Sequence, residues 1–201
     1  MKDINLEEFT LYSGGAKGSD FYWDLIGSRF GITNRVDFRP ESLYGLYLSE
    51  LIEIEKAYER AVKDLGRKEL LPSTYAGKLV RRDYLQAKYA DAVFAISVLV
   101  APGEKDPNPK GYINKTKKVL VAGGTAYAVQ MAINLGKPVY VFDQIKNKWF
   151  TWENNTFVEI THAPFLTLKF AGIGTREINE AGKSAILACY KNTIAKKYLP
   201  H

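Results

Sequence analysis

The sequence predicts one α/β domain over residues 1–201, with a Rossmann-like fold: a mainly parallel sheet with helices on both faces. Two observations lead to this prediction. Short apolar runs alternate with helical patterns along the chain, and glycine-rich turns connect three of these runs to helical patterns. Such alternation is typical of parallel sheets, whose strands are joined through helices. A chain of this length can bury a full core in one domain, and no linker divides it.

The expected strands are short apolar runs bounded by turn residues. They lie at about 9–13, 34–38, 91–98, 118–122, 138–143 and 167–172. A small hairpin is expected at 147–160, where aromatic residues alternate around Asn154 and Asn155. The segment 101–118 is rich in Pro, Gly, Lys and Asn and predicts a long exposed loop, of a kind that is commonly functional.

The expected helices fill the intervals between the strands. One begins near Asp20, and the others cover 49–66, 80–90, 125–136 and 178–199. Ser49 is placed to cap the second helix and Gly66 to end it. Cys189 lies on an amphipathic pattern in the last helix and is expected in the core.

The composition favours an anionic partner and an intracellular protein. Lys and Arg number 28 against 22 Asp and Glu, a net charge of +6 that attracts phosphates, nucleic acids or acidic proteins. The basic residues are scattered, which is more typical of a solvated surface than of a nucleic-acid stripe. The chain has one cysteine, no long apolar run for a membrane span and no signal-peptide core, so we expect a cytoplasmic location.

Three glycine turns are the candidate binding elements: SGGAKGSD at 13–20, GGT at 123–125 and GIGTRE at 172–177. The first turn of a helix exposes unpaired N–H groups and partial positive charge, and glycine lets a ligand approach the backbone, so phosphate is the natural occupant. In a parallel sheet, such turns emerge at one edge and are expected to converge on one crevice. Each turn taken alone is more often a simple tight turn.

Several kinds of chemistry lose support from the same motifs. The turn at 13–20 lacks the spacing of a P-loop, and 172–177 has Glu177 where a dinucleotide fingerprint has its third glycine. Mg-dependent phosphoryl transfer and NAD redox chemistry are therefore disfavoured. His162 and His201 are isolated, so no metal site, cofactor or Ser-His-Asp set is expected.

The motifs resemble those of the SLOG superfamily, which includes the Lonely Guy nucleotide hydrolases, the DNA-processing protein of competence and stand-alone nucleotide sensors. SGGAKGSD at 13–20 is similar to the superfamily's "SGGAxGAD" turn, and AGIGTRE at 171–177 to the "AGIGSRE" opening of related phage and bacterial members. The segment 79–96, followed by Gly123-Gly124, resembles the Lonely Guy pattern of an arginine-bearing helix, a strand and "PGGxGT". The resemblance implies that Arg82 is the site arginine, a phosphate ligand.

The order of the motifs differs from that of the relatives. In those proteins the "GSRE" strand comes first, whereas here GIGTRE and the last helix close the chain. We interpret this as a circular permutation, which is compatible with domain termini that lie close together at the surface. Layouts of this kind look most like those of phage proteins, and relatives commonly form homo-oligomers that complete sites across an interface.

The resemblance also bears on catalysis. Lonely Guy enzymes are thought to cleave an N-glycosidic bond with a Glu placed just after the glycine turn. Here 123–134 contains no Asp or Glu, and Val129 or Gln130 stands in that place. Since Gln cannot carry charge or accept a proton in this role, the pattern favours binding over turnover, with no catalytic residue assigned. Asp20 and Glu177 remain alternatives for catalysis or as ribose-hydroxyl acceptors, although helix-start carboxylates are the commoner explanation.

The sequence therefore predicts a protein that binds, and sequesters, a small phosphate-bearing nucleotide of the ADP-ribose or cyclic type, as a phage sponge for a host defence signal. The alternatives are a nucleoside-monophosphate N-glycosidase and a single-stranded nucleic-acid binder. The predicted ligand-binding residues are Ser13, Gly14, Gly15, Ala16, Lys17, Gly18, Asp20, Arg82, Gly123, Gly124, Thr125, Gln130, Gly172, Gly174, Thr175, Arg176 and Glu177.

Overall fold

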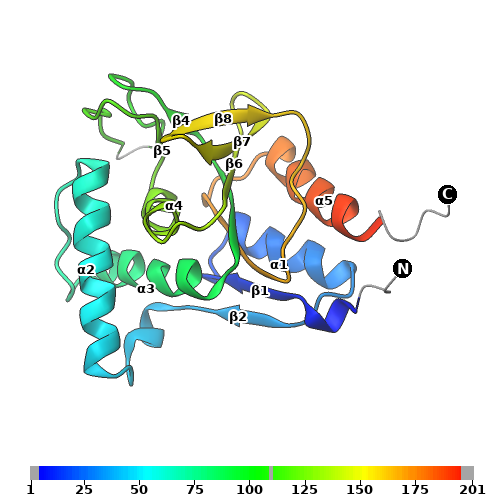
Figure 1. Ribbon diagram of the computed structural model, residues 1–201, viewed down its shortest axis with the longest axis horizontal. Helices are drawn as coiled ribbons and strands as arrows, with labels where there is room; N and C mark the ends of the chain where they lie inside the picture. Colours follow the sequence, from blue (N-terminus) through cyan, green and yellow to red (C-terminus); the bar gives the residue numbers. More distant parts are fainter. Residues whose placement is uncertain (1–4, 109–110, 196–201) are drawn as a thin grey trace.

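A computed structural model describes residues 5–108 and 111–195, which contain one seven-stranded sheet in the order β2-β1-β9-β3-β6-β7-β8 (Figure 1). From β2 to β6 every neighbouring pair is parallel, whereas β6, β7 and β8 pair antiparallel. The strands are β1 (Thr10–Ser13), β2 (Arg35–Asp37), β3 (Ala92–Ser97), β6 (Val139–Asp143), β7 (Lys148–Glu153), β8 (Thr156–Ile160) and β9 (Lys169–Gly174). The helices are α1 (Ser19–Arg29), α2 (Leu48–Leu65), α3 (Tyr75–Tyr89), α4 (Thr125–Asn134) and α5 (Glu180–Ala195), with short 3-10 turns η1 (Leu6–Glu8) and η2 (Pro40–Leu43).

Helices cover both faces of the sheet. The central strand β3 has six buried residues in a row, and its side chains alternate between two cores. Val93 and Ala95 pack in a core with α2, α3 and α4, whereas Phe94 and Ile96 pack in a core with α1 and α5. Figure 1 shows the same division, with α2, α3 and α4 apart from the pair α1 and α5. The predicted fold class is confirmed.

The strand order has a simple relation to the Rossmann topology. If the strands are counted from β9 and then β1, β2, β3 and β6, their order in the sheet becomes 3-2-1-4-5, the Rossmann order. The two ends of the described chain also share one core, since Leu6 packs against the cluster that contains Ile194.

The helix boundaries correct two predictions. Ser49 does not cap α2: Tyr47 is the N-cap, and the Glu50 carboxylate accepts a hydrogen bond from its N–H at 3.0 Å. Helix α3 begins at Tyr75, earlier than expected, because the Thr74 hydroxyl accepts from the Gly77 N–H and starts the helix there. Gly66 ends α2 in the left-handed conformation, as predicted. The predicted helical residues 196–199 and His201 lie outside the described residues.

The predicted strand at 118–122 does not join the main sheet. Only β5 (Leu120–Val121) forms there, and it pairs antiparallel with β4 (Leu99–Val100) in a separate two-stranded sheet. The second glycine turn therefore follows this small sheet, whereas the first and third turns follow neighbouring strands of the main sheet.

Asn154 and Asn155 both have positive φ and join β7 to β8 as a tight hairpin. Within residues 5–108 and 111–195, no helix has the length and apolar character needed to cross a membrane.

Candidate functional site

The first and third glycine turns meet at the carboxyl ends of β1 and β9. Both the N–H and the hydroxyl of Ser19 donate to the Thr175 carbonyl, at 3.0 and 2.8 Å. A Cβ added to Gly18, whose φ is 94°, would lie 2.6 Å from the Thr175 oxygen. Glycine thus occupies the position where the backbones of the two turns touch. The turns 13–20 and 172–177 together form one continuous rim at this edge of the sheet, which we call the lip.

Asp20 supports both turns from inside. Its carboxylate accepts hydrogen bonds from the N–H groups of Gly14 at 3.1 Å and Ala16 at 3.5 Å, and its surroundings include the Gly174 backbone. Burial raises the pKa of Asp20 to about 6, against the opposing effects of the Arg82 guanidinium and these N–H groups. Its carboxylate is thus turned toward the backbone of the turns and is only 6% exposed.

Three N–H groups of the first turn have no partner within the described residues, those of Gly15, Lys17 and Gly18. Gly15 and Lys17 are exposed. These N–H groups precede α1, whose N-terminal partial positive charge adds to their attraction for an anion.

Arg82 on α3 lies directly against this turn. A Cβ on Gly14 would collide with both terminal nitrogens of its guanidinium, so glycine at this position makes room for the arginine. Arg82 is only 7% exposed. Its Nη1 lies 3.0 Å from an Asp83 carboxylate oxygen, and its Nε has no partner in the part of the chain that the structure describes. This buried cation therefore retains donor capacity beside the glycine turn.

Asp83 is a member of the site that sequence reasoning missed. Burial raises the pKa of Asp83 to about 7, with Arg82 lowering it and the nearby Asp20 carboxylate raising it further. Two buried carboxyls thus lie near one guanidinium, and burial raises the pKa of both. Its position next to Arg82 in the sequence was the available signal.

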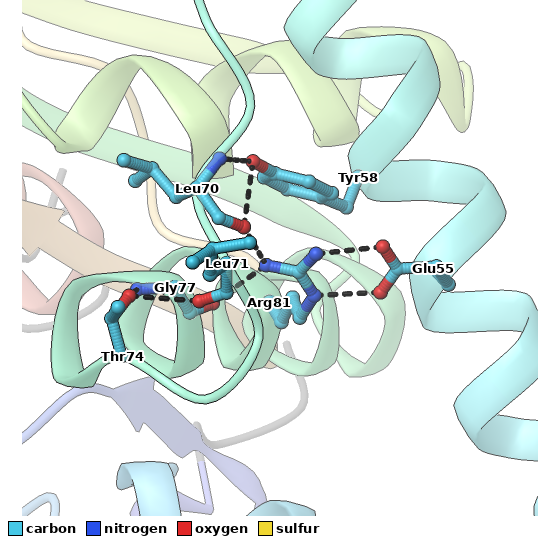
Figure 2. Close-up of polar contacts among 7 residues, drawn as sticks. All are labelled: Glu55, Tyr58, Leu70, Leu71, Thr74, Gly77 and Arg81. Atoms are coloured by element: carbon cyan, nitrogen blue, oxygen red, sulfur yellow. Dashed lines mark hydrogen bonds and ion pairs between the residues drawn. The ribbon is translucent and has the colours of Figure 1, made fainter.

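Arg81, the residue before Arg82 on α3, contacts helix α2 instead of the first glycine turn. Figure 2 shows its guanidinium held between Glu55 on α2 and the Leu70 and Gly77 carbonyls. Both hydrogen bonds to the Glu55 carboxylate measure 2.6 Å, and the group stacks on the Tyr58 ring at 3.9 Å. This clamp fixes α3 to α2 and so fixes the direction in which Arg82 points.

The second glycine turn follows the small sheet, and the backbone of Gly123 is already hydrogen-bonded to other residues. The Gly123 N–H donates to the Asp106 carboxylate at 2.7 Å, and the Gly123 carbonyl accepts from Arg67 at 2.7 Å. Arg67 also stacks on the Tyr112 ring at 4.2 Å. Within the described residues, no hydrogen bond joins this turn to the other two. Gly124 is exposed and Thr125 partly buried at the start of α4, but this side of the predicted crevice carries its own carboxylate.

The 101–118 loop, which contacts this turn through Asp106, is less exposed than predicted. Asp106 is 1% exposed and Asn114 2% exposed, although most of the loop is at the surface. The Asn114 amide donates to the carbonyls of Val100 and Lys118 and ties the two ends of the loop together. The loop is therefore anchored at both its ends and its middle.

Other predicted residues have different surroundings. Gln130 donates to Asn134 along α4 and lines a hollow with Trp152 and Phe157. The Ser13 hydroxyl donates to the Gly172 carbonyl and joins β1 to β9, while a Cβ on Gly172 would lie 2.6 Å from the Trp23 ring.

The end of the third turn is more open. Arg176 and Glu177 are exposed at its lip. The Glu177 N–H donates to the Thr175 hydroxyl, and its carbonyl accepts from Gln144.

Asp37, a second residue that sequence reasoning missed, lies beside the first turn. It ends β2, the strand next to β1, and a Cβ on Gly15 would lie 2.9 Å from its Oδ2. The signal was its place at the carboxyl end of an expected strand.

What these groups can do is bind an anion. They combine free backbone N–H groups, a buried guanidinium and two carboxyls at the edge of parallel strands. Among the described residues, no group of His, Cys, Asp and Glu side chains is arranged to hold a metal ion.

Comparison of the chain with models of protein families, with curated proteins and with solved structures found no match. The chemistry of its own residues is therefore what points to a function.

Proposed function

We propose that this protein binds a small phosphate-bearing nucleotide, of the ADP-ribose or cyclic type, where the turns at 13–20 and 172–177 meet. The observation that carries the proposal is the Arg82 guanidinium packed against Gly14, next to the free N–H groups of Gly15, Lys17 and Gly18. An arginine fork and helix-start N–H groups together recognise phosphate, and ligands of such sheets bind at the carboxyl ends of the parallel strands.

The two carboxyls set the electrostatic terms of binding. Asp83 is the counter-ion of Arg82, so a phosphate that reaches the guanidinium competes with it. Because the pKa of Asp83 is already about 7, the approach of a second anion favours its protonated form. Ligand binding therefore takes up a proton.

We further propose that the protein holds its ligand without turning it over. The segment after Gly123-Gly124 has no Asp or Glu through Asn134, and Asp20 is turned into the backbone of the turns. Binding without turnover suits sequestration of a signal, such as a nucleotide made in host defence against a phage. The strand order counted from β9 supports a permuted Rossmann-like sheet, as the resemblance to SLOG proteins implies.

A second candidate function is favoured by one observation. Asp83 is a buried carboxyl with a pKa of about 7 beside the site arginine, and a raised pKa suits a general acid for N-glycosidic cleavage. Incubation of the protein with nucleoside monophosphates, followed by chromatography of free bases, separates the two functions. Sequestration predicts no release above one equivalent, and sustained release that is lost in Asp83→Asn would establish the hydrolase.

Binding itself is tested by calorimetry with ADP-ribose, ADP, AMP and a cyclic dinucleotide, and by mass spectrometry of small molecules released on denaturation. The matched variants are Arg82→Met at the turn and Arg176→Met at the exposed lip. We expect at least one nucleotide to bind, and Arg82→Met to weaken binding more than Arg176→Met does. No binding of any of these nucleotides, with no copurified ligand, would overturn the proposal.

A further inference from the structure

Asp37 lies beside the first glycine turn. It is the last residue of β2, in register with Ser13 at the end of β1, and its Oδ2 borders Gly15. A side chain at Gly15 would fill the space between the turn and the carboxylate. Any ligand whose phosphate lies on the N–H groups of Gly15 and Gly18 therefore passes within reach of Asp37.

The carboxylate of Asp37 is under-used in the absence of ligand. Its Oδ2 pairs with Arg35 at 3.1 Å, but Arg35 also pairs with Asp24 and is 41% exposed. Its Oδ1 is buried and has no donor within the described residues. A carboxylate can accept about four hydrogen bonds and turns readily about its Cβ–Cγ bond, so either oxygen can accept from a ligand at the turn.

The segments around Asp37 form a βαβ unit, in which a carboxylate at this position can bind part of a ligand. Strand β1, the glycine turn, α1 and β2 make a parallel βαβ unit, with Asp37 about 20 residues after the turn. In units of this kind the pyrophosphate lies on the helix N-terminus and an acidic residue at the end of the second strand receives the ribose hydroxyls.

We infer that Asp37 accepts hydrogen bonds from the two neighbouring hydroxyls of a ribose whose phosphates lie on the 13–20 turn. The ligand is then a nucleoside diphosphate, or a molecule built on one, with both hydroxyls of that ribose free. A phosphate on either hydroxyl would bring a second anion against the carboxylate. This inference rests on the proposed function and favours the ADP-ribose type of ligand over cyclic nucleotides with an esterified ribose.

The test is a thermodynamic cycle measured by calorimetry on the whole protein, with ADP and 2′,3′-dideoxy-ADP as probes. The variants are Asp37→Asn and, as a matched control, Asp24→Asn, which removes the other carboxylate on Arg35 without touching the turn. We expect dideoxy-ADP to bind the natural protein about tenfold more weakly than ADP, since it lacks a charge-assisted contact. Asp37→Asn should lose the same factor for ADP and little for dideoxy-ADP, and Asp24→Asn should change neither.

The outcomes separate this inference from the function beneath it. If ADP binds the natural protein but Asp37→Asn, with an unchanged melting temperature, keeps full preference for ADP over dideoxy-ADP, Asp37 does not read the ribose. If neither nucleotide nor inorganic pyrophosphate binds the natural protein, the proposed function fails and this inference fails with it. Binding of pyrophosphate as tight as that of ADP also contradicts a ribose contact.

Discussion

Arg81 and Arg82 are neighbours in the sequence, equally buried, and differ in how their hydrogen-bonding capacity is used. Arg81 makes four hydrogen bonds, two to Glu55 and two to backbone carbonyls, and covers a tyrosine ring. Arg82 has one ion pair, with Asp83, and an Nε without a partner among the described residues. Successive residues on a helix point about 100° apart, so one arginine faces α2 and the other faces the glycine turn.

This difference indicates that Arg81 has a structural role and that Arg82 has donors left for a ligand. A buried guanidinium whose donors are all used stabilises the fold and has little left for a ligand. A buried guanidinium with unused donors, next to unpaired backbone N–H groups, costs stability that a bound anion would restore. Arg81 thus holds α3 in place, and this fixes the position of Arg82 beside the glycine turn.

The largest expected effect is on stability, from Arg81→Ala. The change removes two hydrogen bonds to Glu55, one each to the Leu70 and Gly77 carbonyls and the contact with the Tyr58 ring, and we expect the free energy of unfolding to fall by about 3 kcal/mol. Urea denaturation measures it. Glu55→Gln, which keeps one acceptor, should cost less, and a loss under about 0.5 kcal/mol for Arg81→Ala would show that the clamp is not structural.

The next effect is on binding, from Arg82→Met. This change removes a charge-assisted contact but keeps the buried methylene volume, and we expect ADP binding to weaken by about 2 kcal/mol, or roughly thirtyfold. Calorimetry at a temperature where the variant is folded gives the affinity. If Arg81→Ala weakens ADP binding as much as Arg82→Met does, the assignment of a structural role to Arg81 and a binding role to Arg82 is wrong.

A pH dependence of stability follows from the carboxyls around Arg82. The folded-state pKa values of Asp20 and Asp83, about 6 and 7, both lie above the ordinary 3.8, so the folded protein binds more protons than the unfolded chain between these limits. The resulting stabilisation is complete at low pH and is lost as pH rises through about 6 to 7. Through these groups, we expect the free energy of unfolding to be higher at about pH 5 than at about pH 8, by about 1 kcal/mol or more, as measured by denaturation.

Asp83→Asn is the control for that dependence, because it cannot titrate. The natural protein and this variant should diverge in unfolding free energy across the window, and parallel curves would show that Asp83 does not titrate there. ADP binding measured in two buffers of different ionisation enthalpy should also show proton uptake near neutral pH.

The smallest effect is expected at the exposed lip. Lys17 and Arg176 point from exposed positions, so Lys17→Ala and Arg176→Ala should change the unfolding free energy by less than about 0.5 kcal/mol. Through screened attraction alone, each should weaken ADP binding only two- to threefold, by roughly 0.5 kcal/mol. A loss as large as that of Arg82→Met would move the centre of the site to the lip.

The sequence predicted those features that depend on local patterns. The alternation of apolar runs and helices gave the α/β class, Gly66 marked a helix end, and Gly14 and Gly18 marked a turn that needs close backbone approach. The role of Arg82 as a phosphate ligand came from a resemblance and stays a prediction, and the structure places its guanidinium against Gly14. No local feature of the sequence, however, distinguishes the directions of Arg81 and Arg82.

The missed features depend on contacts between distant segments. The two-residue strands of the small sheet are too short to leave a periodic signal, so the sequence did not predict that the strand before the Gly123 turn lies outside the main sheet. The pairing of Asp106 with Gly123 joins a loop to a turn by one carboxylate, and composition cannot reveal it. The approach of Asp37 to Gly15 depends on strand register.

The most direct test of the proposed nucleotide site is an NMR titration of the isotope-labelled protein with ADP. We expect the largest amide shifts at Gly15, Lys17 and Gly18, because their N–H groups are the unpaired donors at the first turn, and we expect Arg82→Met to suppress them. Shifts confined to the hairpin or the 101–118 loop, or no shift at millimolar ADP, would contradict a phosphate site at the meeting of the two turns.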